Sequence, residues 1–412
     1  MKIISKKNTY LDFASATPID KRVLKLMFSY DNDFFANATS IHKDGIKARS
    51  IIEEARKNIA LGLNAHSDEI VFTGSSTESN AMVILGVVNS YKLLTTNKGK
   101  TPHIITSSIE HPAILKNCQI LADKGEVELT YIPVDENGII NPKDIKNAIK
   151  INTALISIMY ANNEIGTIQP IQEIAKEIRH YKKNLSKDIS SFPLFHTDAT
   201  QAMNYLYISN MDKLGVDLLS FNGSKIYGPK GVGVLYKKRG IKISPIYSGG
   251  EQEFGLRSGT ENVSSIAGLA LAFEIANKMK DKELVRLTKI RDYAIDELLA
   301  MSNDNFSIIL NGEKVKRLPN NINISISGIS SELLVVELDA KGIEISSKSA
   351  CKSGEDNGSY VIEALRKAKN EKFNEEEGSL RITLGRDTKK GDIDKFLSVL
   401  SKILEKYSKW KK

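Results

Sequence analysis

The residues best suited to covalent chemistry lie in residues 222–233, which read Asn-Gly-Ser-Lys-Ile-Tyr-Gly-Pro-Lys-Gly-Val-Gly. The apolar run directly before them, residues 218–221, is typical of a buried strand. Lys225 stands where such a strand ends and a glycine-rich turn begins, a position that can keep an amine partly desolvated. A desolvated amine loses its proton more readily and forms a Schiff base with a carbonyl compound. Because most lysines are exposed, an ordinary surface lysine is the alternative at this point.

A second candidate site follows the strand expected at residues 70–73, where the chain reads Gly-Ser-Ser-Thr-Glu-Ser-Asn before a helical pattern. Small residues and hydroxyls at a strand-to-helix turn can bind phosphate, because backbone amides and the helix N-terminus point at the anion. Serine and threonine also cap helices that bind nothing. The sequence lacks the Gly-Lys-Ser/Thr of a Walker motif.

A third site is Asp198, which ends the apolar stretch that starts at residue 194. A carboxylate at the end of a buried strand needs a partner, because an isolated buried charge is costly. It could cap a helix, or it could pair with a protonated ring nitrogen of a cofactor. Two more strand ends carry polar clusters, one around His111 and one around Asn162.

Together these residues fit pyridoxal phosphate (PLP). This cofactor needs a lysine for its aldehyde, a carboxylate for its ring nitrogen, a phosphate cup and a flat or polar group against its ring. Lys225, Asp198, residues 74–77 and His111 supply these in order.

The composition is that of an ordinary globular protein of 412 residues, with 41% hydrophobic and 26% charged residues. The net charge of +8 is spread along the chain, so we expect no direct nucleic-acid contact, although an acidic protein partner would suit it. No apolar run reaches membrane-spanning length and the first residues lack a signal-peptide pattern, so we expect no membrane association and a cytoplasmic location.

The two cysteines differ in their surroundings. Cys118 lies in a helical apolar pattern and is expected in the core. Cys351 lies among small and polar residues with Lys348 and Lys352 beside it, which predicts an exposed loop in which the thiolate is favoured. Their spacing indicates neither a disulfide nor a structural zinc site.

Short apolar runs alternate with helical patterns from about residue 69 to residue 235, which predicts an α/β fold with a mostly parallel sheet. A long helix capped by Thr260 should lead into a smaller α+β domain. We expect a large domain at residues 15–262, and a small domain at 263–412 that is joined by residues 1–14 and carries the Cys351 loop. The expected strands are 70–73, 103–106, 128–132, 154–159, 194–196, 218–221, 233–236, 322–326, 343–345 and 380–384, with one near residue 308.

The chain resembles the cysteine desulfurases of the class V aminotransferase family, the NifS- and IscS-like branch of the PLP enzymes of fold type I. The opening residues 10–18, Tyr-Leu-Asp-Phe-Ala-Ser-Ala-Thr-Pro, are similar to the family's Y-L-D-x-A-A-T-T-P. The other matching motifs are residues 77–80, 110–111, 162–166, 198–201, 225–231, 257–260, 349–351 and 381–386.

The resemblance implies a role for each matching residue. Lys225 would attach the cofactor and later move the Cα proton, Asp198 would pair with the ring nitrogen, and His111 would stack on the ring. Arg381 would bind the substrate carboxylate and Cys351 would be the nucleophile. The remaining contacts would be Asn162 and Gln201 to the ring substituents, Asn162 also to the substrate, Ser76, Thr77 and Ser224 to the phosphate, and Thr260 to the phosphate of the other subunit of a homodimer.

The reaction that it implies removes sulfur from L-cysteine, leaving alanine and a persulfide on Cys351. An acceptor protein, either an iron–sulfur scaffold or a tRNA-thiolation protein, would then take the sulfur. The enzyme itself would hold no metal, and Cys351 would contact a cluster only transiently.

Several positions depart from the family pattern. Ser224 stands where histidine usually precedes the lysine, Asn222 where serine is common, and residues 36–42 lack the usual glycine and proline. These departures put cofactor affinity and rate in question rather than the type of reaction. Two alternatives stay open: a selenocysteine lyase on the same scaffold, and an inactive homologue that only binds partners.

Overall fold

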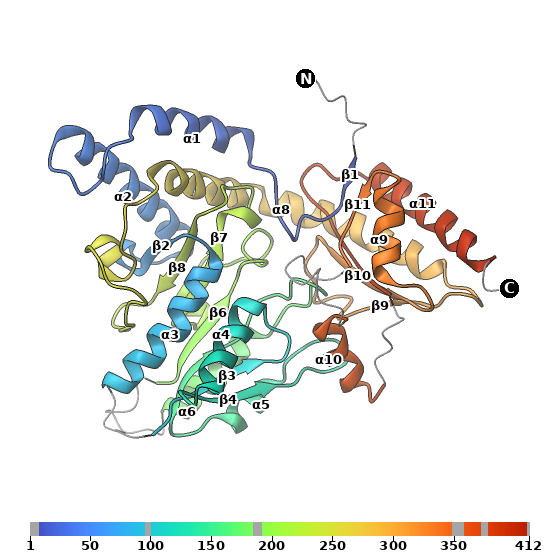
Figure 1. Ribbon diagram of the computed structural model, residues 1–412, viewed down its shortest axis with the longest axis horizontal. Coiled ribbons are helices and arrows are strands. Elements are labelled where there is room, and N and C mark those ends of the chain that lie inside the picture. Colours follow the sequence, from blue (N-terminus) through green and yellow to red (C-terminus); the bar gives the residue numbers. More distant parts are fainter. Residues whose placement is uncertain (1–7, 95–99, 184–191, 348–357, 372–377, 410–412) are drawn as a thin grey trace.

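A computed structural model describes residues 8–94, 100–183, 192–347, 358–371 and 378–409. These residues form a large part, built around a sheet of seven strands, and a smaller part with its own three-stranded sheet (Figure 1). The Cys351 loop lies outside the described residues.

The large sheet has the strand order β2-β8-β7-β6-β5-β3-β4. Strands β3 to β7 run parallel to one another, and β8 is antiparallel to both β7 and β2. Ligands bind beyond the carboxyl ends of the strands in sheets of this kind. The strands are β2 (Ile70–Thr73), β3 (His103–Ser107), β4 (Glu128–Ile132), β5 (Thr153–Ser157), β6 (Leu194–Asp198), β7 (Leu218–Asn222) and β8 (Gly233–Lys237).

The helices around this sheet begin at residues with clear start signals. His42 and Asn141 accept hydrogen bonds from backbone N–H groups in the first turn of α2 and α5, and His111 does the same for α4, where Pro112 is the first helical residue. The helices are α1 (Lys21–Asp33), α2 (Lys43–Leu63), α3 (Ser76–Leu94), α4 (Pro112–Asp123), α5 (Pro142–Ala148), α6 (Ile171–Lys182) and α7 (Met211–Leu214).

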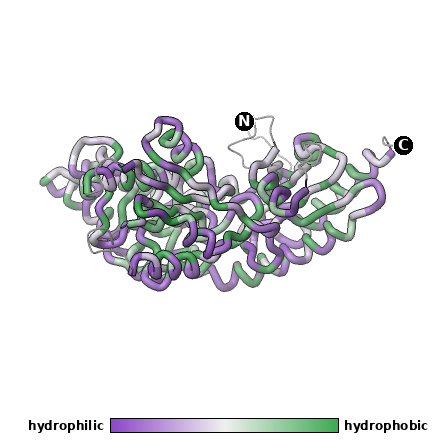
Figure 2. The backbone as a smooth tube through the Cα atoms, turned by 90° about the horizontal axis from the view of Figure 1, so that it is seen from below, coloured by the Kyte–Doolittle hydropathy of each residue, from purple (hydrophilic) through white to green (hydrophobic). Residues whose placement is uncertain are grey.

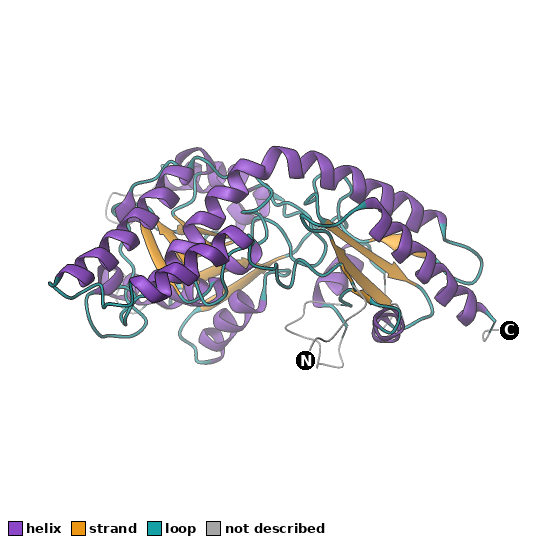
Figure 3. Ribbon diagram, turned by 90° about the horizontal axis from the view of Figure 1, so that it is seen from above, coloured by secondary structure: helices purple, strands orange, loops and turns teal. Residues whose placement is uncertain are grey.

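Helix α8 (Val263–Ala300) runs along both parts of the molecule (Figure 3). It packs against α1 and α2 of the large part and against β9, β10 and α11 of the small part. Because this one helix belongs to both, the division at residue 262 stays a prediction. Hydrophobic and hydrophilic stretches alternate along the chain (Figure 2), as expected for elements that bury one face.

The small part is antiparallel, with strand order β12-β10-β9. A separate pair of strands lies outside this sheet. In this pair β1 (Thr9–Tyr10), at the start of the chain, runs parallel to β11 (Ile343–Glu344). The other elements are β9 (Ile308–Leu310), β10 (Asn321–Ile326), β12 (Gly378–Thr383), α9 (Ser331–Asp339), α10 (Tyr360–Ala368) and α11 (Lys390–Ser408).

After β1 the chain crosses to the large part. The Ala14 N–H donates to Thr383 Oγ1 in the small part at 2.9 Å, whereas the Thr17 N–H donates to the Ser224 carbonyl in the large part at 3.0 Å. The crossing is therefore at residues 14–17, beside the motif that contains Lys225.

The expected α/β architecture is confirmed, and each strand predicted from the sequence is present within a few residues of its expected bounds. The expected cap of α8 is wrong: Asn262, not Thr260, accepts from the Ser265 N–H, at 3.0 Å. Helix α1, helix α7 and strand β1 were not predicted. Cys118 is fully buried, as expected.

Candidate active site

A cavity of about 180 Å³ opens at the carboxyl ends of the large sheet, between the two parts of the chain. Most of the predicted site residues face it. Its lining consists of Ala14, Ser15, Ser76, Thr77, His111, Met159, Ala161, Asn163, Asp198, Thr200, Gln201, Asn222, Ser224, Lys225 and Arg381.

Asp198, the last residue of β6, is held in place by hydrogen bonds to both of its oxygens. Asn80 Nδ2 donates to Oδ2 at 2.7 Å, and the Thr200 N–H donates to Oδ1 at 2.9 Å. The carboxylate is buried and still borders the cavity. It is thus a fixed negative charge, suited to a cationic N–H group of a ligand.

Lys225 reaches the cavity from a tight turn after β7. Gly223 is needed there, because a Cβ at that position would collide with the Pro229 carbonyl. The Lys225 ammonium donates to the Ser15 carbonyl. The amine therefore lies next to the crossing of the N-terminal segment.

Tyr227 follows Lys225 in the same turn and adopts a left-handed backbone conformation that favours glycine, with φ of 63°. Its N–H donates to Thr17 Oγ1 and its carbonyl accepts from the Asp20 N–H, both at 2.9 Å. The Arg386 guanidinium stacks over its ring at 3.9 Å from the centroid. These contacts offset the strain in the Tyr227 backbone and hold in place the turn that carries Lys225.

The N-terminus of helix α3 forms the end of the cavity that is predicted to bind phosphate. Asn222 Nδ2 donates to Ser76 Oγ at 2.7 Å, and Ser224 Oγ donates to Asn222 Oδ1 at 3.0 Å. Because Ser76 Oγ accepts from Asn222, its own proton can point at an anion. The proton of Ser224, by contrast, is directed at Asn222. Thr77 is exposed at the cavity mouth.

His111 caps α4 and lines the cavity at the same time. Its Nδ1 accepts from the Ala113 N–H at 3.1 Å. Burial lowers the pKa of His111, which outweighs the opposite effect of Asp198. The ring is therefore neutral near pH 7, which suits stacking on a flat ligand.

Glu110, next to His111, lies in a motif that matched the family pattern, but no role was predicted for it from the sequence. Burial raises its pKa to about 8. Its Oε1 accepts from Ser107 Oγ at 2.7 Å and from the Met159 N–H at 2.9 Å, whereas Oε2 is buried without a partner among the described residues. Glu110 is thus a neutral acid behind the cavity wall.

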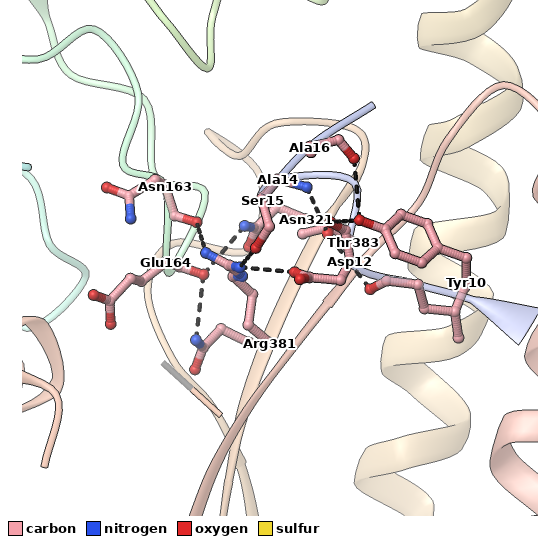
Figure 4. Close-up of polar contacts among 12 residues, drawn as sticks. Tyr10, Asp12, Ala14, Ser15, Ala16, Asn163, Glu164, Asn321, Arg381 and Thr383 are labelled. Carbon is pink, nitrogen blue, oxygen red and sulfur yellow. Dashed lines mark hydrogen bonds and ion pairs between the residues drawn. The ribbon is translucent and has the colours of Figure 1, made fainter. Parts of the chain in front are cut away.

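Arg381 of β12 is the cation that the small part contributes, and it is only 2% exposed. Its Nη2 donates to Asp12 Oδ1 and to Ser15 Oγ, both at 2.7 Å, and its Nη1 donates to the Asn163 carbonyl at 3.2 Å (Figure 4). Its Nε is buried without a partner among the described residues. A guanidinium with an unpaired buried N–H is suited to an incoming carboxylate.

The structure places Asn163, not Asn162, on the cavity. Asn162 is fully buried: its Nδ2 donates to the Ile109 carbonyl at 2.9 Å, and its Oδ1 accepts from the N–H groups of Glu164 and Ile165. The Oδ1 of Asn163 is buried without a partner among the described residues. The geometry therefore favours Asn163 for the contacts that the sequence-based prediction gave to Asn162.

Three other predicted residues have different outcomes. Gln201 lines the cavity and donates through Nε2 to the Ala14 carbonyl at 3.0 Å. Thr260 is exposed and is absent from the described cavity lining. Cys351 lies outside the described residues.

The cavity fits PLP by the chemistry of its donors and acceptors. A fixed carboxylate, an amine, a neutral imidazole and a set of hydroxyls at a helix N-terminus border one space, each in a position that the cofactor can use. Among the described residues, no group of three or more His, Cys, Asp or Glu is arranged to bind a metal ion. The fold and the site define a PLP-dependent enzyme of fold type I.

The chain belongs to the class V aminotransferase family, whose sequence pattern it matches over residues 9–396. It is 46% identical over 401 residues to a protein named cysteine desulfurase IscS from Dictyoglomus turgidum, with 97% of this chain and 95% of the relative covered. A protein of the same name from Methanosarcina thermophila is 41% identical over 403 residues, covering 97% and 93%.

Solved structures of similar proteins have the same fold. A NifS-like protein superposes with a TM-score of 0.85 at 31% identity, over 97% of this chain and 99% of that chain. SspA in complex with cysteine superposes with a TM-score of 0.75 at 32% identity, covering 91% and 98%. The predicted family, fold type, cofactor and cysteine desulfurase activity are thereby confirmed.

No helix among the described residues is both long enough and apolar enough to cross a membrane. The cytoplasmic location stays a prediction.

Proposed function

We propose that this cysteine desulfurase works through Lys225, Asp198, His111, Arg381 and Cys351 in the roles that follow. The observation that carries the proposal is the single cavity in which Lys225, Asp198 and Arg381 meet, although they come from distant parts of the chain. When bound, PLP supplies an aldehyde that captures amines and a ring that stabilises negative charge at the Cα of the captured amino acid.

Lys225 would hold the cofactor through its amine, and the same amine would take the proton from the substrate Cα and later return it. Asp198 keeps the ring nitrogen protonated, because the two donors on its carboxylate fix its position at the cavity. His111 stays neutral and covers the ring. Ser76, Thr77 and Asn222 hold the phosphate, with Ser224 supporting Asn222.

Arg381 binds the α-carboxylate and Asn163 contributes a side-chain contact, so that the substrate sulfur is held in one orientation. The Cys351 thiolate attacks that sulfur. A sulfur–sulfur bond forms, the bond between Cβ and sulfur breaks with its electron pair moving to Cβ, Cβ is then protonated, and Cα regains the proton that Lys225 took. The products are alanine and a Cys351 persulfide.

The test is to mix the PLP-loaded protein with L-cysteine and a reductant and to measure sulfide and alanine. Lys225→Ala should abolish both products. Cys351→Ala should abolish them too while leaving the absorbance of the bound cofactor in place. Absence of alanine from a protein that carries PLP would refute the proposed function.

We also propose a homodimer, in which Thr260 of each subunit completes the phosphate site of the other. Large apolar side chains are exposed at the end of the large part that carries α1 and α2: Phe28 is 74% exposed, Phe35 85% and Ile41 92%. Phe254 and Glu261, close to Thr260 in sequence, line one hollow with Ala38 and Thr39. Sedimentation should show a dimer, and Phe35→Glu should shift it towards monomer and weaken PLP binding.

The sulfur acceptor is a protein, and we propose an iron–sulfur scaffold or a tRNA-thiolation protein. The net charge of +8 suits an acidic partner. Incubation of the sulfur-loaded enzyme with each candidate should move labelled sulfur to the true acceptor, and no transfer to either would reject both.

A further inference from the structure

Ser15 lies between the two cations of the cavity. Its carbonyl accepts from Lys225 Nζ. Its Oγ accepts from Arg381 Nη2 at 2.7 Å (Figure 4). It also lines the cavity. The family pattern that the opening motif resembles has alanine at this position, so the hydroxyl is a feature of this chain.

The hydrogen bonds of Arg381 restrict how a carboxylate can bind to it. A guanidinium presents two forks of parallel N–H groups, one formed by Nε and Nη2 and the other by Nη1 and Nη2. Both protons of Nη2 are already donated, one to Asp12 and one to Ser15. A carboxylate that binds through either fork must therefore replace one of these two partners.

Asp12 is the harder of the two to displace. It forms an ion pair with Arg381 at 2.7 Å, and charge-assisted bonds of this kind are the stronger ones. Its backbone is also fixed, because Asp12 bridges to Thr383 and its carbonyl accepts from Tyr10 Oη at 2.9 Å. The hydroxyl of Ser15 is neutral and needs only a rotation about one bond to leave.

The unpaired Nε of Arg381 indicates which fork the carboxylate uses. This nitrogen is buried and lacks a partner among the described residues, which is costly for a charged donor. A carboxylate on Nε and Nη2 would satisfy it and would need one of the two bonds of Nη2 to break, of which the bond to the neutral Ser15 hydroxyl is the weaker.

We propose that Ser15 is an affinity-determining residue whose hydroxyl occupies Arg381 Nη2 until the substrate α-carboxylate replaces it. This inference rests on the proposed function, in which Arg381 binds that carboxylate. Each carboxylate that binds breaks one hydrogen bond of the protein, so amino acids bind more weakly than they would with alanine at this position. The product alanine is released sooner for the same reason.

The test is a titration of the PLP-loaded protein with L-alanine, followed by the change in visible absorbance, in wild type and Ser15→Ala. Ser15→Ala should bind L-alanine about three- to tenfold more tightly, the equivalent of the net contribution of one hydrogen bond. Ethylamine, which is alanine without its carboxylate, should bind equally to both proteins. Ser15→Thr keeps the hydroxyl and is the matched control, with an affinity close to that of wild type.

A KM for L-cysteine that falls in Ser15→Ala would support the same conclusion. Equal or weaker binding of L-alanine to Ser15→Ala, an equal change with ethylamine, or tighter binding to Ser15→Thr would overturn the inference. These outcomes are separate from a failure of the proposed function, which would appear as a PLP-loaded wild type that makes no alanine from cysteine.

Discussion

Replacing Ser224 by histidine should tighten the binding of PLP. The proton of Ser224 is directed at Asn222 Oδ1, so this residue offers the phosphate no donor in the observed arrangement. A histidine would add an N–H donor and, when protonated, a positive charge beside a dianion. Charge-assisted hydrogen bonds contribute about 1.5–3 kcal/mol. Ser224 is only half-buried, so we expect about 1–2 kcal/mol, or a five- to thirtyfold lower dissociation constant.

The gain should depend on pH, because a phosphate raises the pKa of a neighbouring imidazole and favours its charged form. It is largest where the imidazole is protonated and shrinks as the pH rises above its pKa. The assay is equilibrium dialysis of PLP against the purified proteins at several pH values. Pyridoxal, which lacks the phosphate, is the control ligand and should bind wild type and Ser224→His equally.

Two further variants separate the effect of the new imidazole from the effect of losing the Ser224 hydroxyl or of crowding Asn222. Ser224→Ala should change PLP affinity little, because the hydroxyl points at Asn222. The double variant Asn222→Ser/Ser224→His restores the common family pattern and should bind PLP at least as tightly as Ser224→His alone. If both histidine variants bound PLP no more tightly than wild type, or if pyridoxal responded equally, the reasoning about this phosphate site would be refuted.

Three predictions concern buried polar side chains. Glu110→Gln should lose less stability than wild type in thermal unfolding as the pH rises from 5 to 8. Because the pKa of Glu110 is raised to about 8, the stability of wild type falls as the pH rises towards that value. Parallel stability curves for the two proteins would contradict this prediction. Glu253→Gln should cost about 3 kcal/mol in the free energy of unfolding by denaturant. It removes the buried carboxylate that pairs with Arg56 at 2.7 Å and leaves Arg56 only the exposed Glu53 at 3.2 Å as an ion-pair partner among the described residues, and a loss below about 1 kcal/mol would refute the prediction. Asn163→Ala should raise the KM for L-cysteine with little loss of stability, whereas Asn162→Ala should lower the unfolding midpoint, and the reverse result would restore Asn162 to the site.

Much of the fold could be predicted from the sequence because its strands are short apolar runs between helices with clear start signals. Strand β2, for example, lies at the expected residues, 70–73. Strand β1 could not be predicted, because two residues acquire their strand geometry only by pairing with β11, more than 300 positions away. Helix α1 lies outside the region of regular alternation, and only Val23 among its residues is buried.

Asp198 and Lys225 stood out in the sequence because they lie at or near strand ends, and both line the cavity. Which residues face the cavity could not be predicted where this depends on the direction of a side chain. Two adjacent asparagines cannot be told apart by composition, and only the hydrogen bonds made by Asn162 show that it faces away from the cavity. Ser15 was missed because its partner Arg381 is distant in sequence.

The central claim is that Cys351 receives the sulfur. The most direct test is to react the PLP-loaded protein with one equivalent of L-cysteine, block free thiols, and map the protein by mass spectrometry. We predict one added sulfur atom on the peptide that contains Cys351, in proportion to the alanine formed, and none on the peptide of the buried Cys118. Alanine formed without added sulfur on Cys351, or with sulfur on Cys118 instead, would contradict the account.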